Sequence, residues 1–272
     1  MATVLRQENI AANTASNAML TYHHDADSEF QLALSWLLPD PIKKHGGRIE
    51  RLQETLHETE AVYVKNAVER RVMEFTAGRA CARVALGLLG LHDLPVGMGA
   101  RREPLWPQGA VGSISHAAGY CVAAVSPREH VAGLGVDIES ASPLPDALIN
   151  LACTPAERTW CESQASGTIG LMAKFVFSAK EAVFKCLYPV FGEELDFEDA
   201  ALEIDMQRGR FLARISRVAL NTGADLELHG RLACTSELVL TSAFLHDVDC
   251  EWLGHSYTPR QLDGCEGRFI CN

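Results

Sequence analysis

The sequence has no excess of basic residues. Its 272 residues contain 24 lysines and arginines against 35 aspartates and glutamates, a formal net charge of −11. Nucleic-acid-binding proteins carry a basic surface, so this composition argues against that class and leaves any anionic ligand to a local cluster. One such cluster lies between residues 65 and 102, where basic residues outnumber Glu69, Glu74 and Asp93; it consists of Lys65, Arg70, Arg71, Arg79, Arg83, Arg101 and Arg102.

Long apolar runs and paired cysteines are also missing. No run approaches the roughly 18 apolar residues of a membrane-spanning helix, and residues 1–20 lack the apolar core of a signal peptide. The nine cysteines are scattered without a Cys-x-x-Cys pair, which argues against a zinc ribbon or a disulfide scaffold. We therefore expect a cytoplasmic protein that does not bind membranes or nucleic acid.

The apolar periodicity predicts an α+β protein. We expect a buried strand over residues 31–38, helices over 54–91 with a break near 76–78, and a hairpin of strands 111–116 and 120–126. A strand over 135–139, a helix over 175–188 and a strand meander over 195–245 follow. Each half of the chain thus shows helix followed by antiparallel strands.

The predicted helix 175–188 carries charges beside its apolar face. Glu181 and Lys185 are four residues apart and share a face of the helix, with Lys180 next to them. A purely structural interpretation is available, because Ser178 and Glu181 have the spacing of a capping box and Glu181 with Lys185 that of a stabilising ion pair.

A second acidic pair lies in the predicted strand Gly-Val-Asp-Ile-Glu of residues 135–139. Because side chains alternate along a strand, Asp137 and Glu139 lie on one face and Val136 and Ile138 on the other. Two neighbouring carboxylates repel each other unless they face water or hold a cation. Together with Glu181 they could bind Mg²⁺, which prefers carboxylate oxygens and accepts phosphate oxygens as further ligands.

These two stretches together resemble a known family. Residues 135–139 and the sequence Phe-Ser-Ala-Lys-Glu-Ala-Val-Phe-Lys of residues 177–185 are similar to the two-part signature of the Sfp-type 4'-phosphopantetheinyl transferases. Two upstream blocks, Glu-Pro-Leu-Trp-Pro at 103–107 and Gly-Ser-Ile-Ser-His at 112–116, resemble the branch that includes the enterobactin-pathway (EntD-like) and actinobacterial enzymes. The resemblance covers residues 75–189. Phe177 replaces a more common tryptophan, and the apolar Ile138 cannot be a ligand.

The resemblance implies a fold of two similar α+β lobes, each an antiparallel sheet packed with helices, with the cofactor in the cleft between them. We expect the N-terminal lobe at residues 1–128, the C-terminal lobe at 129–257 and a peripheral tail at 258–272. The first lobe would contact the adenosine and phosphates of coenzyme A, and the second would hold the metal site and the catalytic helix.

The resemblance also assigns site residues. Glu181 and Lys185 would be catalytic. Asp137, Glu139 and Glu181 would hold Mg²⁺, with Mn²⁺ as the alternative cation. Coenzyme A, the co-substrate, would be bound by Arg71, Arg79, Arg83, Arg101, Ser115, His116, Lys180 and Lys185. From the residues alone, Arg79 and Arg83 could equally be solvated helix surface, and His116 a core histidine.

The implied reaction transfers the 4'-phosphopantetheine arm of coenzyme A to a serine of an apo acyl, peptidyl or aryl carrier protein. It releases adenosine 3',5'-bisphosphate, and the enzyme would act as a monomer. Two other functions use the same residues: a magnesium-dependent hydrolase of small phosphate compounds, and a non-catalytic module that binds carrier proteins or nucleotides. The sequence does not identify the carrier protein.

Overall fold

The computed structural model describes residues 25–246, except 165, 217 and 223; the predicted tail 258–272 lies outside this part. Its helices are α1 (Ala26–Leu37), η1 (Ile49–Arg51), α2 (Glu58–Ala61), η2 (Val62–Val64), α3 (Glu69–Gly87), α4 (Asp146–Ala152), α5 (Pro155–Ser163), α6 (Ile169–Phe191) and η3 (Phe197–Asp199). Its strands are β1 (Lys43–Arg48), β2 (Gly97–Met98), β3 (Pro104–Leu105), β4 (Ala110–Ala117), β5 (Tyr120–Pro127), β6 (Gly133–Ser140), β7 (Ala200–Asp205), β8 (Arg210–Ile215), β9 (Leu226–Cys234) and β10 (Leu238–Leu245).

Antiparallel sheets and helices make up two neighbouring halves, as the α+β prediction requires. The first sheet has the order β1-β5-β4, the second β6-β10-β9-β8-β7, and β2 pairs with β3 in a short hairpin. Helix α3 packs its Ala77, Cys81 and Ala85 on one face of β5, and α6 covers the corresponding face of the larger sheet. None of the helices in the described residues has the length and apolar character of a membrane span.

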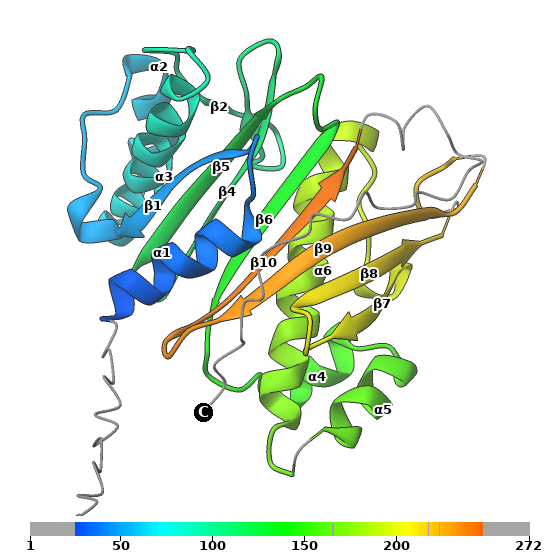
Figure 1. Cartoon of the computed structure of the whole chain (residues 1–272). Coiled ribbons are helices and arrows are strands. Elements are labelled where there is room, and N and C mark those ends of the chain that lie inside the picture. The colour runs from blue at the N-terminus through cyan, green and yellow to red at the C-terminus, as the bar shows by residue number, and fades with distance from the viewer. Residues whose placement is uncertain (1–24, 165, 217, 223, 247–272) are drawn as a thin grey trace, which may run out of the picture.

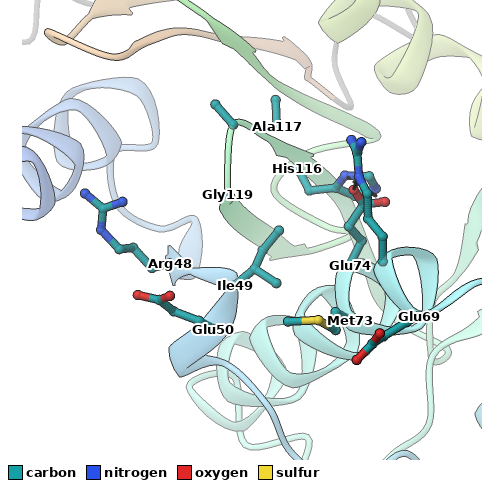
Figure 2. A pocket seen from close by; sticks show the side chains of 11 residues that line it. Arg48, Ile49, Glu50, Glu69, Met73, Glu74, His116, Ala117 and Gly119 are labelled. Atoms are coloured by element: carbon teal, nitrogen blue, oxygen red, sulfur yellow. Dashed lines mark hydrogen bonds and ion pairs between the residues drawn. The ribbon is translucent and has the colours of Figure 1, made fainter.

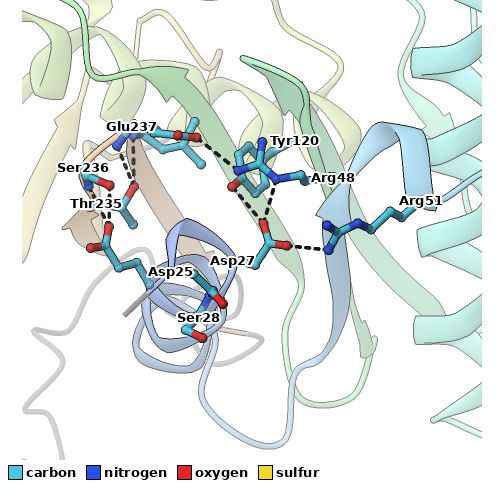
Figure 3. A network of polar contacts seen from close by, with 11 residues as sticks. Asp25, Asp27, Ser28, Arg48, Arg51, Tyr120, Thr235, Ser236 and Glu237 are labelled. Atoms are coloured by element: carbon cyan, nitrogen blue, oxygen red, sulfur yellow. Dashed lines mark hydrogen bonds and ion pairs between the residues drawn. The ribbon is translucent and has the colours of Figure 1, made fainter. Parts of the chain in front are cut away.

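Helix α1 covers the opposite face of both sheets (Figure 1). Its Phe30, Leu34 and Leu37 pack in one cluster with apolar residues of β5, β6 and β10. Polar contacts at its start reach both halves (Figure 3): Asp27 accepts a hydrogen bond from Arg48, and Glu29 accepts one from the Ser236 hydroxyl. The helix therefore joins the two sheets rather than belonging to one.

Two serine hydroxyls join the sheets where β4 meets β6. Ser113 and Ser115 are both buried, and their Oγ atoms accept hydrogen bonds from the N–H groups of Val136 (3.1 Å) and Ile138 (3.2 Å). A buried N–H without a partner would cost about 1–3 kcal/mol. These alternate serines therefore stabilise the junction beside the acidic strand.

Glycine allows α6 to lie directly on β6. A Cβ atom at Gly135 would be 1.8 Å from the carbonyl oxygen of Ala182, closer than any real contact. Because α6 approaches this closely, Glu181 lies over the strand that carries Asp137. The glycine of the Gly-Val-Asp-Ile-Glu stretch thus positions the two acidic segments relative to each other.

Three local predictions are wrong. Residues 31–38 lie in a helix and not in a strand, because Phe30, Leu34 and Leu37 have helical spacing and Asp25 caps the helix by accepting from Ser28 N–H. Helix α3 continues through residues 76–78, where Gly78 allows close packing against Ile114 of β4. Ser178 is no cap, because α6 begins nine residues earlier in the chain, at Ile169.

Strand β1, which pairs with β5, was not predicted, and the helix predicted over 175–188 is longer at both ends. The other predicted strands are confirmed. Both hairpin strands, the acidic strand and the strands of the meander form where the alternation of apolar residues places them. Ala118 and Gly119 make the predicted tight connection with positive φ angles of 49° and 81°. Val136 and Ile138 lie in the apolar cluster under α1, which directs the acids of β6 to the other face.

Candidate functional site

Three carboxylates lie near one another where α6 packs on β6, but not closely enough to hold a metal ion together. Asp137 and Glu139 extend from the strand, and Glu181 from the helix. Burial raises the pKa of Glu181; Lys185 opposes this effect, whereas Asp137 and Glu139 add to it. Burial also raises the pKa of Glu139, and neighbouring Asp137 raises it further. The three acids are therefore close enough to repel one another.

Lysines neutralise the two strand carboxylates. The Lys185 ammonium lies 2.6 Å from Asp137 Oδ1 and 3.1 Å from Ser115 Oγ. The Lys174 ammonium lies 3.2 Å from Glu139 Oε2. Within the described part of the chain, no three Asp, Glu, His or Cys side chains are placed closely enough to hold a metal ion together. As placed, Asp137 and Glu139 are each compensated by an ammonium group.

A line of basic groups leads from α3 to these acids. Arg71 and Arg79 are two helical turns apart and lie over the ring of Phe75, with guanidinium carbons 5.9 and 4.2 Å from its centroid. The Nη1 atom of Arg71 is 3.3 Å from His116 Nε2. Burial lowers the pKa of His116; Glu74 opposes this effect, whereas Arg71 and Lys185 add to it. His116 thus lies near both Arg71 and Lys185.

Arg79 has a buried donor without a partner. The side chain is 5% exposed, and Nη2 donates to the carbonyl oxygen of Gly97 at 2.9 Å. Its Nε is the one buried side-chain nitrogen or oxygen without a hydrogen bond among the described residues. Burial lowers the pKa of Arg79 to about 10, so the group is charged at neutral pH. Most buried polar groups in folded proteins have a hydrogen-bond partner, and an anionic ligand would supply the acceptor that this nitrogen lacks.

A pocket of about 930 Å³ is lined in part by His116. Figure 2 shows it between the segment at Arg48, the first turns of α3 and the β4–β5 hairpin. Its charged side chains have both signs, and Ile49 and Met73 supply apolar surface. Asp137, Glu139 and Glu181 do not line it, so the pocket extends the site rather than containing its acids.

Comparisons with known proteins match both halves of the chain. Residues 58–126 match the 4'-phosphopantetheinyl transferase N-terminal domain, and residues 133–241 match the 4'-phosphopantetheinyl transferase superfamily. The 4'-phosphopantetheinyl transferase PptT of Mycobacterium tuberculosis is 35% identical over 196 residues, which cover 68% of this chain and 84% of that protein. This chain belongs to the 4'-phosphopantetheinyl transferase superfamily.

Further relatives support the same superfamily. The 4'-phosphopantetheinyl transferase Svp of Streptomyces mobaraensis is 44% identical over 157 residues, 57% of this chain and 64% of that protein. Enterobactin synthase component D of Salmonella typhi is 36% identical over 128 residues, 45% of this chain and 50% of that protein. The resemblance to the branch with enterobactin-pathway and actinobacterial proteins is thereby confirmed.

Other residues predicted to contact coenzyme A lie apart from the acids. The Lys180 ammonium is fully buried and bonds to Glu157 and to the carbonyl oxygen of Phe197, both at 2.7 Å. Arg83 bonds to Glu60 Oε2 at 2.7 Å. Arg101 is exposed and pairs with Glu194 at 2.6 Å. Among the predicted basic contacts, the structure groups Arg71, Arg79, His116 and Lys185 most clearly.

Sequence reasoning missed two polar residues of α6 at the site. Lys174 pairs with Glu139, and Ser178 donates to Asp137 Oδ2 at 2.8 Å. Ser115, predicted as a ligand contact, is 5% exposed and donates to Asp137 Oδ1 at 3.1 Å. The missed signal was the spacing of residues 174, 178, 181 and 185, which places four polar side chains on one helix face.

Proposed function

We propose that this protein transfers the 4'-phosphopantetheine arm of coenzyme A to a serine of an apo carrier protein and releases adenosine 3',5'-bisphosphate. The observation that carries the proposal is a row of basic groups that leads to the three carboxylates. The row consists of Arg79, whose Nε lacks a partner, followed by Arg71, His116 and Lys185. Basic groups suit the phosphates of coenzyme A, and the acids suit a cation and a base. Membership of the superfamily supports the same reaction.

Asp137, Glu139 and Glu181 would hold Mg²⁺ or Mn²⁺. Their oxygen donors fit a hard divalent cation, and the raised pKa values of Glu139 and Glu181 reflect buried acids that a cation would stabilise. The ammonium groups now on Asp137 and Glu139 supply positive charge at the same oxygens. When bound, the cation neutralises charge that develops on the diphosphate of coenzyme A.

Glu181 would accept the proton of the carrier serine. A serine hydroxyl is hardly ionised at neutral pH, so its attack on phosphorus needs a base. Glu181 could serve both as base and as ligand if Asp137 and Glu139 share the cation, because one of its oxygens then stays available for the proton. Lys185, whose side chain is 31% exposed, would donate to the diphosphate as the bond to the adenosine side breaks. Such positioned donors stabilise charge in phosphoryl transfer.

Arg71, Arg79 and His116 would bind the phosphates at the adenosine end of coenzyme A. The unpartnered Nε of Arg79 supports this role, and the neighbouring pocket offers space for the base and ribose. Arg101 would have to break its ion pair with Glu194 before it could contact coenzyme A. We propose that three of the predicted contacts hold other side chains in place and do not touch coenzyme A: Ser115 holds Asp137, Arg83 holds Glu60, and Lys180 holds Glu157.

The partners in this proposal are apo acyl, peptidyl or aryl carrier domains. We further propose a cytoplasmic monomer without nucleic-acid or membrane partners. Carrier modification is an intracellular reaction of coenzyme A, and the acidic composition fits neither a nucleic-acid surface nor an anionic membrane.

Incubation with coenzyme A, Mg²⁺ and a panel of apo carriers, read by the mass gained on each carrier, tests the function. Adenosine bisphosphate should form only when a carrier is present; formation without a carrier would support the hydrolase instead. Replacement Glu181→Gln should lower the transfer rate about 10²- to 10³-fold, as for loss of one charge-stabilising group. Glu203→Gln, on the exposed side of β7, is the matched control.

A second measurement separates catalysis from simple binding. In the proposed enzyme, Mg²⁺ should increase the affinity for coenzyme A, and the triple variant Asp137→Asn, Glu139→Gln, Glu181→Gln should lose this increase. Unchanged affinity with and without Mg²⁺, together with no mass gain on any carrier, would support the binding module.

A further inference from the structure

One face of α6 carries four polar side chains against the acidic strand. Lys174, Ser178, Glu181 and Lys185 follow one another at intervals of four, three and four residues, so they line a single side of the helix. Elsewhere on the helix, Val176, Ala179 and Val183 are fully buried apolar residues. Lys174 and Ser178, the first two residues of this row, have no role in the function proposed above.

Ser178 fixes one oxygen of Asp137. The serine has no exposed surface, and its Oγ lies 2.8 Å from Asp137 Oδ2 and 2.9 Å from Thr241 Oγ1. The Thr241 hydroxyl donates to the main-chain oxygen of Ser178 at 2.8 Å. Because an ionised carboxylate oxygen can only accept, the Ser178 hydroxyl donates to Asp137. The other carboxylate oxygen accepts from Ser115 and Lys185.

Lys174 holds the second strand carboxylate. Its side chain is 9% exposed, and its ammonium lies 3.2 Å from Glu139 Oε2 and 5.9 Å from the centre of the Phe177 ring. A lysine this deeply buried needs an anionic partner. Among the described residues, Glu139 is the only carboxylate in contact with this ammonium. Lys174 of α6 thus fixes the position of Glu139, as Ser178 of the same helix fixes that of Asp137.

We propose that Lys174 and Ser178 are positioning residues that orient Glu139 and Asp137 for the divalent cation. This inference rests on the proposed function, because it assumes that these carboxylates are the ligands. Neither side chain needs to touch the cation or coenzyme A. Groups that hydrogen-bond to metal ligands orient them, and their loss typically costs about 10- to 100-fold in metal affinity or activity.

Cation binding can be measured without catalysis. Mn²⁺ is titrated into the protein saturated with coenzyme A, without a carrier, and free Mn²⁺ is followed by electron paramagnetic resonance. Ser178→Ala and Lys174→Met should each weaken Mn²⁺ binding about tenfold or more, and Lys174→Arg should restore most of the affinity. Ser242→Ala is the matched control, because Ser242 is equally buried but donates to the carbonyl oxygen of Leu37.

Kinetics with a carrier give an independent readout. In Ser178→Ala and Lys174→Met, the Mg²⁺ concentration for half-maximal rate should rise by the same factor, while kcat at saturating Mg²⁺ falls less. A general loss of folding would lower kcat and leave the Mg²⁺ dependence unchanged. If Ser178→Ala does not fold, Ser178→Cys keeps the volume with a weaker donor and should show the same shift.

Normal Mn²⁺ affinity and normal Mg²⁺ dependence in both variants would overturn the inference. That result differs from failure of the proposed function, which would appear in the unmodified protein as no Mn²⁺ bound and no carrier modified. Weakened Mn²⁺ binding in Ser242→Ala equal to that in Ser178→Ala would also overturn it, because the effect would then follow from any lost buried hydroxyl.

Discussion

Replacing Lys180 distinguishes a structural lysine from one that binds coenzyme A. Its ammonium is fully buried between Glu157 Oε2 and the main-chain oxygen of Phe197, each at 2.7 Å. Glu157 is itself 3% exposed and also accepts from the N–H groups of Thr154 and Leu202. The pair thus connects α6 with the start of α5 and with β7. Lys180→Met keeps an unbranched side chain that is one atom shorter and removes its charge.

The expected cost follows from the charge that remains. Removal of one partner from a buried ion pair leaves the other uncompensated and typically costs about 3–5 kcal/mol. For a domain of this size, about 2–4 °C of melting temperature corresponds to each kcal/mol, so Lys180→Met should melt about 6–20 °C lower. Adding Glu157→Gln removes the stranded charge and keeps an oxygen for Leu202 N–H. The double variant should therefore regain part of the loss.

Urea unfolding and calorimetric titration with coenzyme A provide the test. We expect Lys180→Met to lose stability and to bind coenzyme A with unchanged affinity at a temperature where it is folded. Lys65→Met, at an exposed position, should change stability by less than about 0.5 kcal/mol. Unchanged stability with an affinity for coenzyme A at least tenfold weaker would refute the structural role and support the sequence-based prediction of a ligand contact.

Two further predictions concern the acids and the glycine that positions them. Burial raises the pKa of Glu181 above the ordinary 4.5. The ionised side chain therefore destabilises the folded protein when the pH exceeds its folded-state pKa. This cost disappears well below pH 4.5, where the carboxyl group is protonated in both the folded and the unfolded protein. Glu181→Gln should therefore melt higher than the unmodified protein at pH 7 in EDTA, with the difference vanishing near pH 4; equal melting temperatures at pH 7 would contradict the burial argument. Gly135→Ala should cost at least about 1–3 kcal/mol in urea unfolding and also lower transfer, because the new Cβ would displace α6. Gly47→Ala, which meets no atom within 4 Å, is its control, and equal stability of both variants would contradict the close approach.

The acidic strand and the charged helix could be predicted because their patterns are local. Alternation in residues 135–139 places Asp137 and Glu139 on one face, and four-residue spacing pairs Glu181 with Lys185. Local rules also give the hairpin, whose turn needs Ala118 and Gly119 with positive φ. Resemblance to a family was needed to bring strand and helix together, because no periodicity specifies which elements pack.

The failures came from contacts between distant segments. Alternating and helical spacing overlap in residues 30–38, so only packing across both sheets decides that α1 is a helix. Lys180 lies next to Glu181 in sequence, but a step of one residue turns about 100° around a helix. That turn directs its side chain to Glu157 rather than to the acids. Neighbours in a helical motif therefore need not share a site.

The same rotation explains how α6 serves both stability and chemistry. Its row of residues 174, 178, 181 and 185 faces β6, whereas Lys180 points to α5 and β7. Gly135 brings the helix backbone against the strand, so small shifts of α6 would change every distance between Glu181 and the strand carboxylates. The Lys180–Glu157 pair restricts such shifts from the opposite side of the helix. A residue outside the site can thus influence catalysis by fixing the position of α6, and its effect should appear in stability before it appears in ligand affinity.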